Sequence, residues 1–300
     1  MNTRRVWKFM LVAMAGFPAA LSAAPSRFVL SDKPAPLQLS ASQESSGLAV
    51  SRRKAGLLWI ANDSGNGPDL YLAGTDGSYQ GTLHINRAAN IDWEDLDSFF
   101  WNGVPWLLVA DTGDNGARRN FCTIYLLPEP SIPDSGQIAE AVPAGMIVFR
   151  YEDGPRDCEA VAVDPASEKI LLISKRTNPP VLYEIPLRLG KSGEIQIAKR
   201  IGVVHVERPL ESPMVPYGNQ PTGLSISPDG SQAAVLTYYG VFLFRHQNGE
   251  AWEKTFSRKP EMLAPHRQKQ AEAITFSRDG KTIFVLSEGT TPPIVTYRAE

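Results

Sequence analysis

A short pattern that recurs five times limits the possible folds of this chain more than any other feature. Each copy has a small or acidic opening residue, an alternating apolar strand, a turn, a strongly apolar strand, a polar loop and a third strand. The copies open with SGLAVS at residue 46, EDLDSF at 94, EAVAVD at 159, TGLSIS at 222 and EAITFS at 272. A repeat of roughly 40 to 50 residues built from short strands is typical of β-propeller blades. The sequence therefore predicts an all-β chain that forms a single β-propeller.

The spacing of the copies indicates the number of blades. The openers are 48, 65, 63 and 50 residues apart, and the two wider intervals contain the proline-rich stretches 128–145 and 206–221, which we interpret as loop insertions. We expect five blades, with six as the alternative if one wide interval contains a degenerate blade. The last copy ends at Arg298 after its third strand, so a strand from the N-terminal RFVLS or PLQLS should close the ring and cover that edge. A β-sandwich explains neither the repeat nor its spacing.

The N-terminus has the layout of a secretory signal peptide. Arg4, Arg5 and Lys8 precede an apolar run from Phe9 to Leu21, and small residues follow. The run is shorter than the roughly 20 residues that a membrane span needs, and no later segment is long and apolar enough. A buried first helix is the alternative. We therefore predict a signal peptide over residues 1–23, a propeller domain over 24–300, a periplasmic or secreted location and no membrane span.

The net charge of the chain narrows its possible partners. Removing residues 1–23 changes the formal net charge from −2 to about −5, and the remaining chain has no basic stripe. Because binding to a phosphate backbone needs such a stripe, we expect no nucleic-acid partner, and we expect a monomer.

Cys122 follows the polar loop of the second copy, and Cys158 precedes the third opener. A disulfide is our prediction for this exported pair, with two buried free thiols as the alternative.

Propeller geometry places the inner-strand openers and the polar loops on one face, because successive strands alternate in direction. We call this face the mouth. Basic and aromatic residues should lie there and could contact an anionic or a flat ligand: Arg118, Arg119, Lys175, Arg176, Trp93, Tyr238 and Tyr239. The alternatives are surface solvation for the basic residues, Lys175 above all, and packing between blades for the aromatic ones. Acidic residues should converge there as well. The candidate metal ligands are Asp63, Glu94, Asp95, Asp111, Asp114 and Asn115, with Asp92, Glu159, Glu272 and Glu288 beside them.

The motifs NDSG, DWEDLD and ADTGDN followed by ARR, all between Asn62 and Arg119, resemble those of secreted bacterial β-propellers of the phytase-like and esterase-like groups. The resemblance implies calcium at the acidic mouth and, for some members, hydrolysis of phosphoesters or lactones. The chain lacks the DxDDPAxW-type stretch associated with alkaline phytases, which argues against phytase activity itself.

The loop ADTGDNGARRN does not fit an EF-hand. Counted from Asp111, the third and twelfth positions are Gly113 and Cys122, where the EF-hand pattern needs acidic or amide ligands. Another oxygen site remains open, because clustered carboxylates repel one another and a divalent cation, calcium first, would relieve that repulsion. Arg118 and Arg119 are the rival explanation, since they could neutralise the same acids. Asp114 and Asn115 could also serve only to shape the turn.

Catalytic roles are assigned only under an enzyme hypothesis. In a metal-assisted hydrolase, Glu94 and Asp111 would hold the ion, Glu159 or Glu272 would act as base, and Arg118 would hold the substrate anion. The alternative for the recurring glutamates is that each accepts hydrogen bonds from the backbone of the next blade. There is no GxSxG motif, and the four histidines are scattered, so nucleophilic catalysis and a zinc cluster are disfavoured.

These observations lead to one main functional hypothesis. We expect an exported β-propeller that binds a divalent cation, calcium favoured, and a small anionic ligand at its acidic mouth. The alternatives are a metal-assisted hydrolase of phosphoesters or lactones, and a protein-interaction platform without a small ligand.

Overall fold

The computed structural model describes residues 27–39, 44–132, 140–190, 193–210 and 212–300. The predicted signal peptide, residues 1–23, lies outside the described residues. The described chain is almost entirely β-structure, with α1 (Trp252–Phe256) as its short helix. Within those ranges, no helix combines the length and the apolar character that crossing a membrane requires.

Most strands form antiparallel runs of four that follow chain order, and the last run takes its outer strand from the N-terminal part of the chain. The first sheet contains β3 (Ser45–Val50), β4 (Leu57–Asn62), β5 (Asp69–Gly74) and β6 (Tyr79–His84). A larger sheet begins with the run β7 (Trp93–Trp101), β8 (Val104–Asp111), β9 (Cys122–Pro128) and β10 (Gly145–Tyr151). Its second run is β11 (Cys158–Asp164), β12 (Lys169–Ser174), β13 (Val181–Pro186) and β14 (Ile195–Val203). These two runs join through a single parallel pair, β10 with β14, which makes one eight-stranded sheet.

Two further sheets complete the described fold. One contains β15 (Gly223–Ile226), β16 (Gln232–Thr237), β17 (Gly240–Arg245) and β18 (Glu261–Met262). The other contains β19 (Ala271–Phe276), β20 (Thr282–Ser287), β21 (Pro293–Ala299) and β1 (Phe28–Leu30), with β2 (Ala35–Pro36) also paired to β21. The N-terminal strand predicted from RFVLS is therefore β1, which pairs antiparallel with β21 and places Phe28 opposite Ala299.

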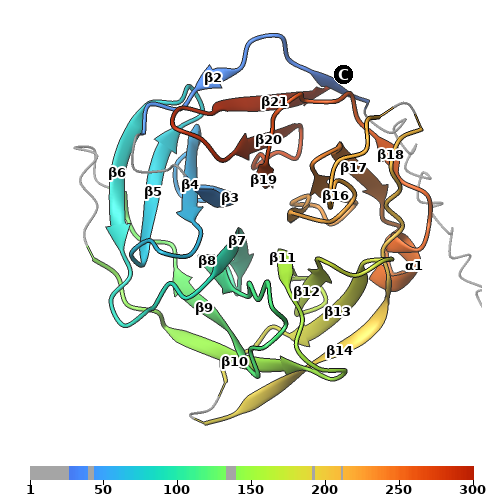
Figure 1. Ribbon diagram of the computed structural model, residues 1–300. Helices are drawn as coiled ribbons and strands as arrows, with labels where there is room; N and C mark the ends of the chain where they lie inside the picture. The colour runs from blue at the N-terminus through green and yellow to red at the C-terminus, as the bar shows by residue number, and fades with distance from the viewer. Residues whose placement is uncertain (1–26, 40–43, 133–139, 191–192, 211) are drawn as a thin grey trace, which may run out of the picture.

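The sheets are arranged around a central axis, as Figure 1 shows, in a propeller-like fold. The first strand of each run is the innermost. Contacts link these inner strands in a circle, from β3 to β7, β11, β15 and β19 and back to β3. The start of every run therefore faces the same central region, which brings together residues that are far apart in sequence.

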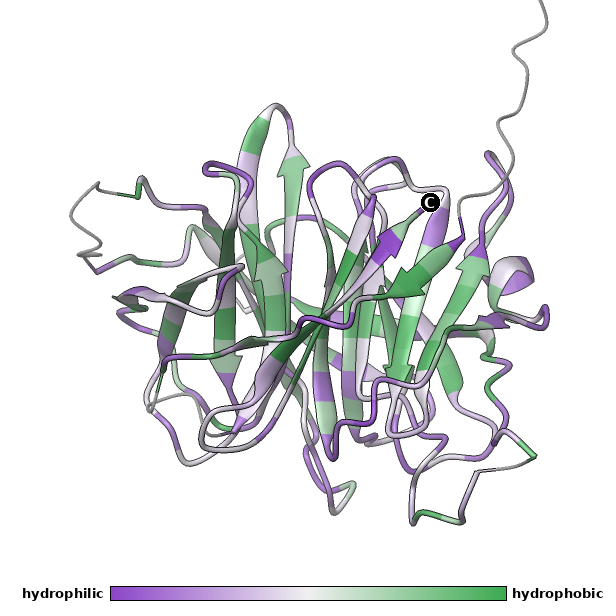
Figure 2. Cartoon of the chain, turned by 90° about the horizontal axis from the view of Figure 1, so that it is seen from above, coloured by the Kyte–Doolittle hydropathy of each residue, from purple (hydrophilic) through white to green (hydrophobic). Residues whose placement is uncertain are grey.

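Apolar side chains fill the space between neighbouring sheets. All six residues of β3 and all seven of β11 are buried, as expected for strands covered on both faces. One core cluster packs Trp59 and Trp93 between the first sheet and the β7 run. In Figure 2 the strands are mostly hydrophobic and the connections at their ends mostly hydrophilic. Hydrophilic residues therefore lie largely in the loops and at the strand ends.

The two cysteines are free in the structure, so the predicted disulfide is not formed. Both lie in the same apolar cluster, and burial raises the pKa of each thiol to about 12. The Cys158 thiol points along its own strand and donates to the Ala160 carbonyl at 3.7 Å. The two residues act as small apolar core groups, the alternative that the sequence left open.

Candidate metal centre

A β-bulge begins four of the five inner strands, and the residue left out of the ladder is the opener of the repeat. In β7 the register passes from Trp93 to Asp95, in β11 from Cys158 to Ala160, and in β19 from Ala271 to Ala273. The unpaired residues are therefore Glu94, Glu159 and Glu272, with Ser46 in β3. Bulges redirect a side chain away from its regular position and are frequent beside functional sites. Here they bring three glutamates to the mouth.

In the part of the chain that the structure describes, two groups of three acids lie close enough to hold a metal ion. The first group is Asp63, Asp92 and Glu94, and the second is Glu94, Asp157 and Glu159. Within each group, one carboxylate oxygen of every residue lies within 4.8 Å of the others. Glu94 belongs to both groups and therefore stands at the centre of the acidic cluster.

Glu94 is a buried carboxylate without a direct hydrogen-bond or ion-pair partner among the described residues, although its negative charge acts on the ammonium of Lys175. Its exposed fraction is 4%, and among the described residues no hydrogen bond or ion pair reaches its side chain. Burial raises its pKa well above the usual range, and the charges of Glu159, Asp63, Asp92 and Asp157 raise it further. Buried charges in proteins are normally paired or bound to metal, so this carboxylate needs a proton or a cation.

The first group contains no cation. Asp63 follows β4, and the Asn90 amide donates to the Asp63 carbonyl at 2.9 Å, which holds the loop in place. The side chain of Asp63 accepts the Ser64 backbone N–H. Burial, followed by the negative charges of Asp92 and Glu272, raises the pKa of Asp63 to about 7. No lysine or arginine ion pair reaches the three acids among the described residues.

The second group already contains two cations. The Arg176 Nε pairs with Asp157 Oδ2 at 2.6 Å, and the Lys175 ammonium pairs with Glu159 Oε2. Asp157 Oδ1 also accepts the Asp114 backbone N–H at 2.9 Å. Burial raises the pKa of Glu159 to about 8 although Lys175 opposes that shift. Two cations therefore partly neutralise the second group, whereas no ion pair neutralises the first among the described residues.

Gly113 makes room for the first group. A Cβ atom built on Gly113 would lie 2.5 Å from Asp92 Cγ, and nearer still to Glu94 Oε1. Any side chain at this position would displace both carboxylates. The glycine that fails the EF-hand pattern is thus required by the acids that lie directly against it, and its backbone N–H donates to the Asp92 carbonyl at 3.1 Å.

The far side of the mouth carries a hydrogen-bonded chain. Tyr238 donates to Glu272 Oε1 at 2.5 Å, and Lys175 Nζ lies 3.5 Å from the Tyr238 hydroxyl. Burial and a hydrogen bond with Glu272 raise the pKa of Glu288 to about 8. At neutral pH, Glu288 can therefore carry a proton within the mouth.

Four predicted metal ligands do not belong to either group. Asp111 is fully buried and forms an ion pair with Arg119 at 2.7 Å, which is the salt-bridge alternative. Asp114 accepts the backbone N–H groups of Arg118 and Arg119 at 2.8 and 2.7 Å, so it shapes the turn. Asn115 accepts from the Arg176 guanidinium.

Asp95, the fourth, is used to join inner strands. Its Oδ2 accepts the backbone N–H of Val161 at 2.7 Å and of Leu224 at 3.2 Å, and its Oδ1 accepts that of Leu96 at 2.8 Å. At this inner strand, the hydrogen bonding to neighbouring strands that was suggested for the glutamate openers is performed by Asp95, the residue after Glu94.

The predicted catalytic residues occupy different surroundings. Glu159 is paired with Lys175, and Glu272 accepts from Tyr238. The Arg118 side chain is exposed and forms no ion pair within the described ranges. Asp157 is the acid that the sequence reasoning missed. The repeated spacing Asp-x-Glu, at Asp92 to Glu94 and again at Asp157 to Glu159, is the signal that could have identified it.

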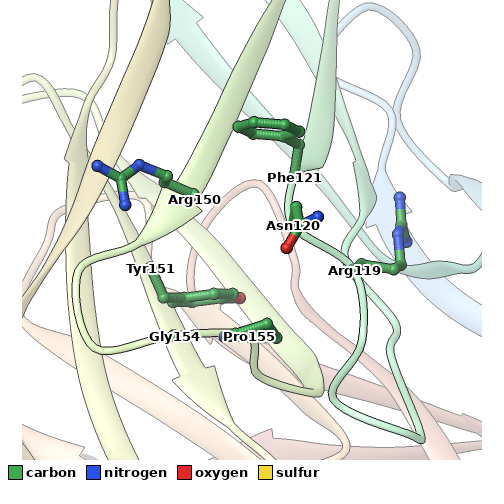
Figure 3. Close-up of a pocket in the computed structure, with 7 residues that line it drawn as sticks. All are labelled: Arg119, Asn120, Phe121, Arg150, Tyr151, Gly154 and Pro155. Carbon is green, nitrogen blue, oxygen red and sulfur yellow. The ribbon is translucent and has the colours of Figure 1, made fainter.

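A cavity of about 340 Å³ lies outside the acidic groups, between the β8–β9 and β10–β11 loops. It is lined by Arg119, Asn120, Phe121, Arg150, Tyr151, Gly154 and Pro155. Figure 3 shows the Arg119 guanidinium pointing away from Arg150 and Tyr151. None of these lining residues is a carboxylate, so this cavity is separate from the candidate metal centre.

Comparisons with known proteins do not assign a family. No protein-family model matches the chain, and no curated protein matches it. Among solved structures, hydrazine synthase of Kuenenia stuttgartiensis is similar over 85% of this chain and 71% of that chain, with 11% identity and a TM-score of 0.42. No family name in these comparisons supports the resemblance to phytase-like or esterase-like propellers.

Proposed function

We propose that this chain is a five-bladed β-propeller that binds one divalent cation, with calcium preferred, through Asp63, Asp92 and Glu94. The blades would be the five runs of four strands, with β10 and β14 joining two blades at their outer edges. We also propose a periplasmic or secreted location, which rests on the charge and hydropathy pattern of residues 1–23.

The unpartnered, buried Glu94 is the observation that carries the proposal. Three carboxylates that are close together and partly dehydrated repel one another, and a divalent ion would neutralise them. Calcium accepts six to eight oxygen ligands and tolerates irregular geometry, so carbonyl groups and water could complete its shell. The donors available at this position are all hard oxygens, which favour calcium over softer transition metals.

Calorimetric titration of calcium into the mature chain, residues 24–300, tests this function. Glu94→Gln should weaken calcium binding at least tenfold, because it removes one ligand charge without changing the side-chain size. Asp229→Asn is the matched control, since Asp229 caps a turn at the opposite end of the inner strands. Absence of both binding heat and a calcium-dependent thermal shift in the unmutated protein would contradict the proposal.

Metal-assisted hydrolysis of phosphoesters or lactones is a second candidate function. The raised pKa of Glu288 and its hydrogen bond with Glu272 favour it, because this pair could exchange a proton beside the bound ion. Arg118 would hold the anionic part of the substrate. Chromogenic phosphoesters and lactones should be cleaved only with the metal present, and turnover that persists after chelation would exclude this mechanism.

A further inference from the structure

Lys175 is buried, which is unusual for a lysine. It comes after β12, its exposed fraction is only 5%, and its ammonium lies inside the mouth. The ammonium pairs with Glu159 Oε2 and lies 3.5 Å from the Tyr238 hydroxyl, with its nitrogen 5.4 Å from the centre of the Tyr238 ring. A lysine side chain normally keeps its charged end in water, so burial here calls for a specific counter-charge.

The acids around Lys175 are spaced like those of the first group. Glu94, Asp157 and Glu159 place one oxygen each within 4.8 Å of one another, which is the same limit that Asp63, Asp92 and Glu94 meet. The difference lies in the cations. Arg176 pairs with Asp157 and Lys175 with Glu159, whereas the shared member, Glu94, forms no hydrogen bond or ion pair among the described residues and interacts with Lys175 only through its charge.

We propose that the mouth contains two cation positions and that Lys175 fills the second with its ammonium, which limits the wild-type protein to one divalent ion. An ammonium is a compact point charge that can replace a small metal ion among carboxylates. If the ammonium is removed, Glu94, Asp157 and Glu159 are left with Arg176 as their nearby cation. A second calcium ion would then occupy the second group. The expectation that the unmutated protein binds one calcium ion rests on the proposed function, whereas the role of Lys175 in the second group does not.

A structural role is a weaker explanation for this lysine. Desolvation offsets most of the attraction in a buried ion pair, so such a pair adds little stability compared with an apolar pair. The other end of β12 provides a direct comparison. Lys169 pairs with Glu184 at 2.6 Å, with exposed side-chain fractions of 40% and 23%. That exposed pair lies away from the mouth, and no acidic group of the candidate centre includes its glutamate.

The test counts the calcium ions bound per chain, by equilibrium dialysis and calorimetry. The unmutated protein should bind one ion, Lys175→Gln two, and the matched control Lys169→Gln one. The double variant Glu159→Gln with Lys175→Gln should bind one, because the second group then loses a ligand. A count for Lys175→Gln equal to that of the unmutated protein would overturn the inference, as would two ions in the double variant.

Failure of the inference can be distinguished from failure of the proposed function. If the unmutated protein binds no calcium, Lys175→Gln binds one ion and the double variant binds none, the proposed function fails and the inference stands. If Lys175→Gln unfolds in chelator, calcium should restore its circular dichroism spectrum and raise its Tm more than that of Lys169→Gln. A variant that calcium does not restore would overturn the inference.

Discussion

At the scale of the residue, carboxylates of the same type have different roles because their nearest partners differ. Glu94 has no hydrogen-bond or ion-pair partner within the described ranges, Glu159 has an ammonium, and Asp95 has three backbone N–H groups. An unpaired buried carboxylate is stabilised by a proton or a cation, whereas a fully hydrogen-bonded one serves the fold. The difference depends on the partners of each side chain and not on its chemical type.

Calcium affinity should depend on pH through these unpaired acids. The pKa of Asp63 is raised to about 7, and that of Glu94 is also raised, so protons compete with calcium at pH 6. We expect affinity to rise from pH 6 to pH 8, and calcium binding to release protons near pH 6. Calorimetry in two buffers of different ionisation enthalpy measures that release, and equal heats in both buffers would contradict it.

In the metal-free protein, the free energy of unfolding should decrease as pH rises, whereas calcium affinity should increase. Because the folded pKa values of these acids lie above their unfolded values, the folded state binds more protons between about pH 4 and pH 7. Stability should therefore fall as pH rises through that window, and saturating calcium should reduce the fall. Thermal unfolding in chelator at pH 5, 6, 7 and 8 measures the trend, with Glu94→Gln expected to show a smaller decrease.

At the scale of the element, side chains join inner strands that do not form a continuous ladder with one another. Asp95 links β7 to β11 and β15, and Asp97 accepts the Val163 N–H at 2.8 Å. Hydroxyl groups have a similar role, since Ser46 donates to the Trp93 carbonyl at 2.7 Å and Thr222 to that of Ala271 at 2.7 Å. Asp95 therefore makes the structural hydrogen bonds, and the adjacent Glu94, which the bulge leaves out of the ladder, is the proposed ligand.

Asp95→Asn should therefore destabilise the protein without removing a metal ligand. The amide nitrogen of asparagine would face a backbone N–H, and an unsatisfied buried group of this kind costs about 1–3 kcal/mol. Urea unfolding in chelator measures the loss, with Asp229→Asn as the control for a solvent-facing turn. Unchanged unfolding free energy, or a calcium affinity reduced as strongly as in Glu94→Gln, would contradict the assignment.

At the scale of the whole molecule, the first described strand of the chain pairs with the last one. β1 pairs with β21, and Phe28 packs against Phe276 with ring centroids 6.1 Å apart. Phe28 is 4% exposed, whereas its neighbour Val29 is 37% exposed. The closing strand thus adds one buried aromatic side chain and covers an edge that would otherwise be open to pairing with another chain.

The buried face of β1 should contribute most of its stabilisation. Phe28→Ala should lower the unfolding free energy by about 3–5 kcal/mol, as is typical of a buried phenylalanine. Val29→Ala in the same strand should lower it by less than about 1 kcal/mol because that side chain is partly in solvent. Urea unfolding of both variants measures the difference, and similar losses would show that β1 is not a closing strand of this kind.

The sequence by itself determined the all-β character, the repeat of strands, the N-terminal strand and the acidity of the mouth. These features follow from local periodicity and from loops that alternate between two faces. Asp63 and Glu94 were predicted at the candidate centre for this reason. The Asp111–Arg119 pair, the turn role of Asp114 and the burial of Lys175 were decided only by the tertiary structure. Their partners depend on bulges and on contacts between separate strands and loops, and a carboxylate becomes a ligand, a counter-ion or a backbone acceptor according to what it faces.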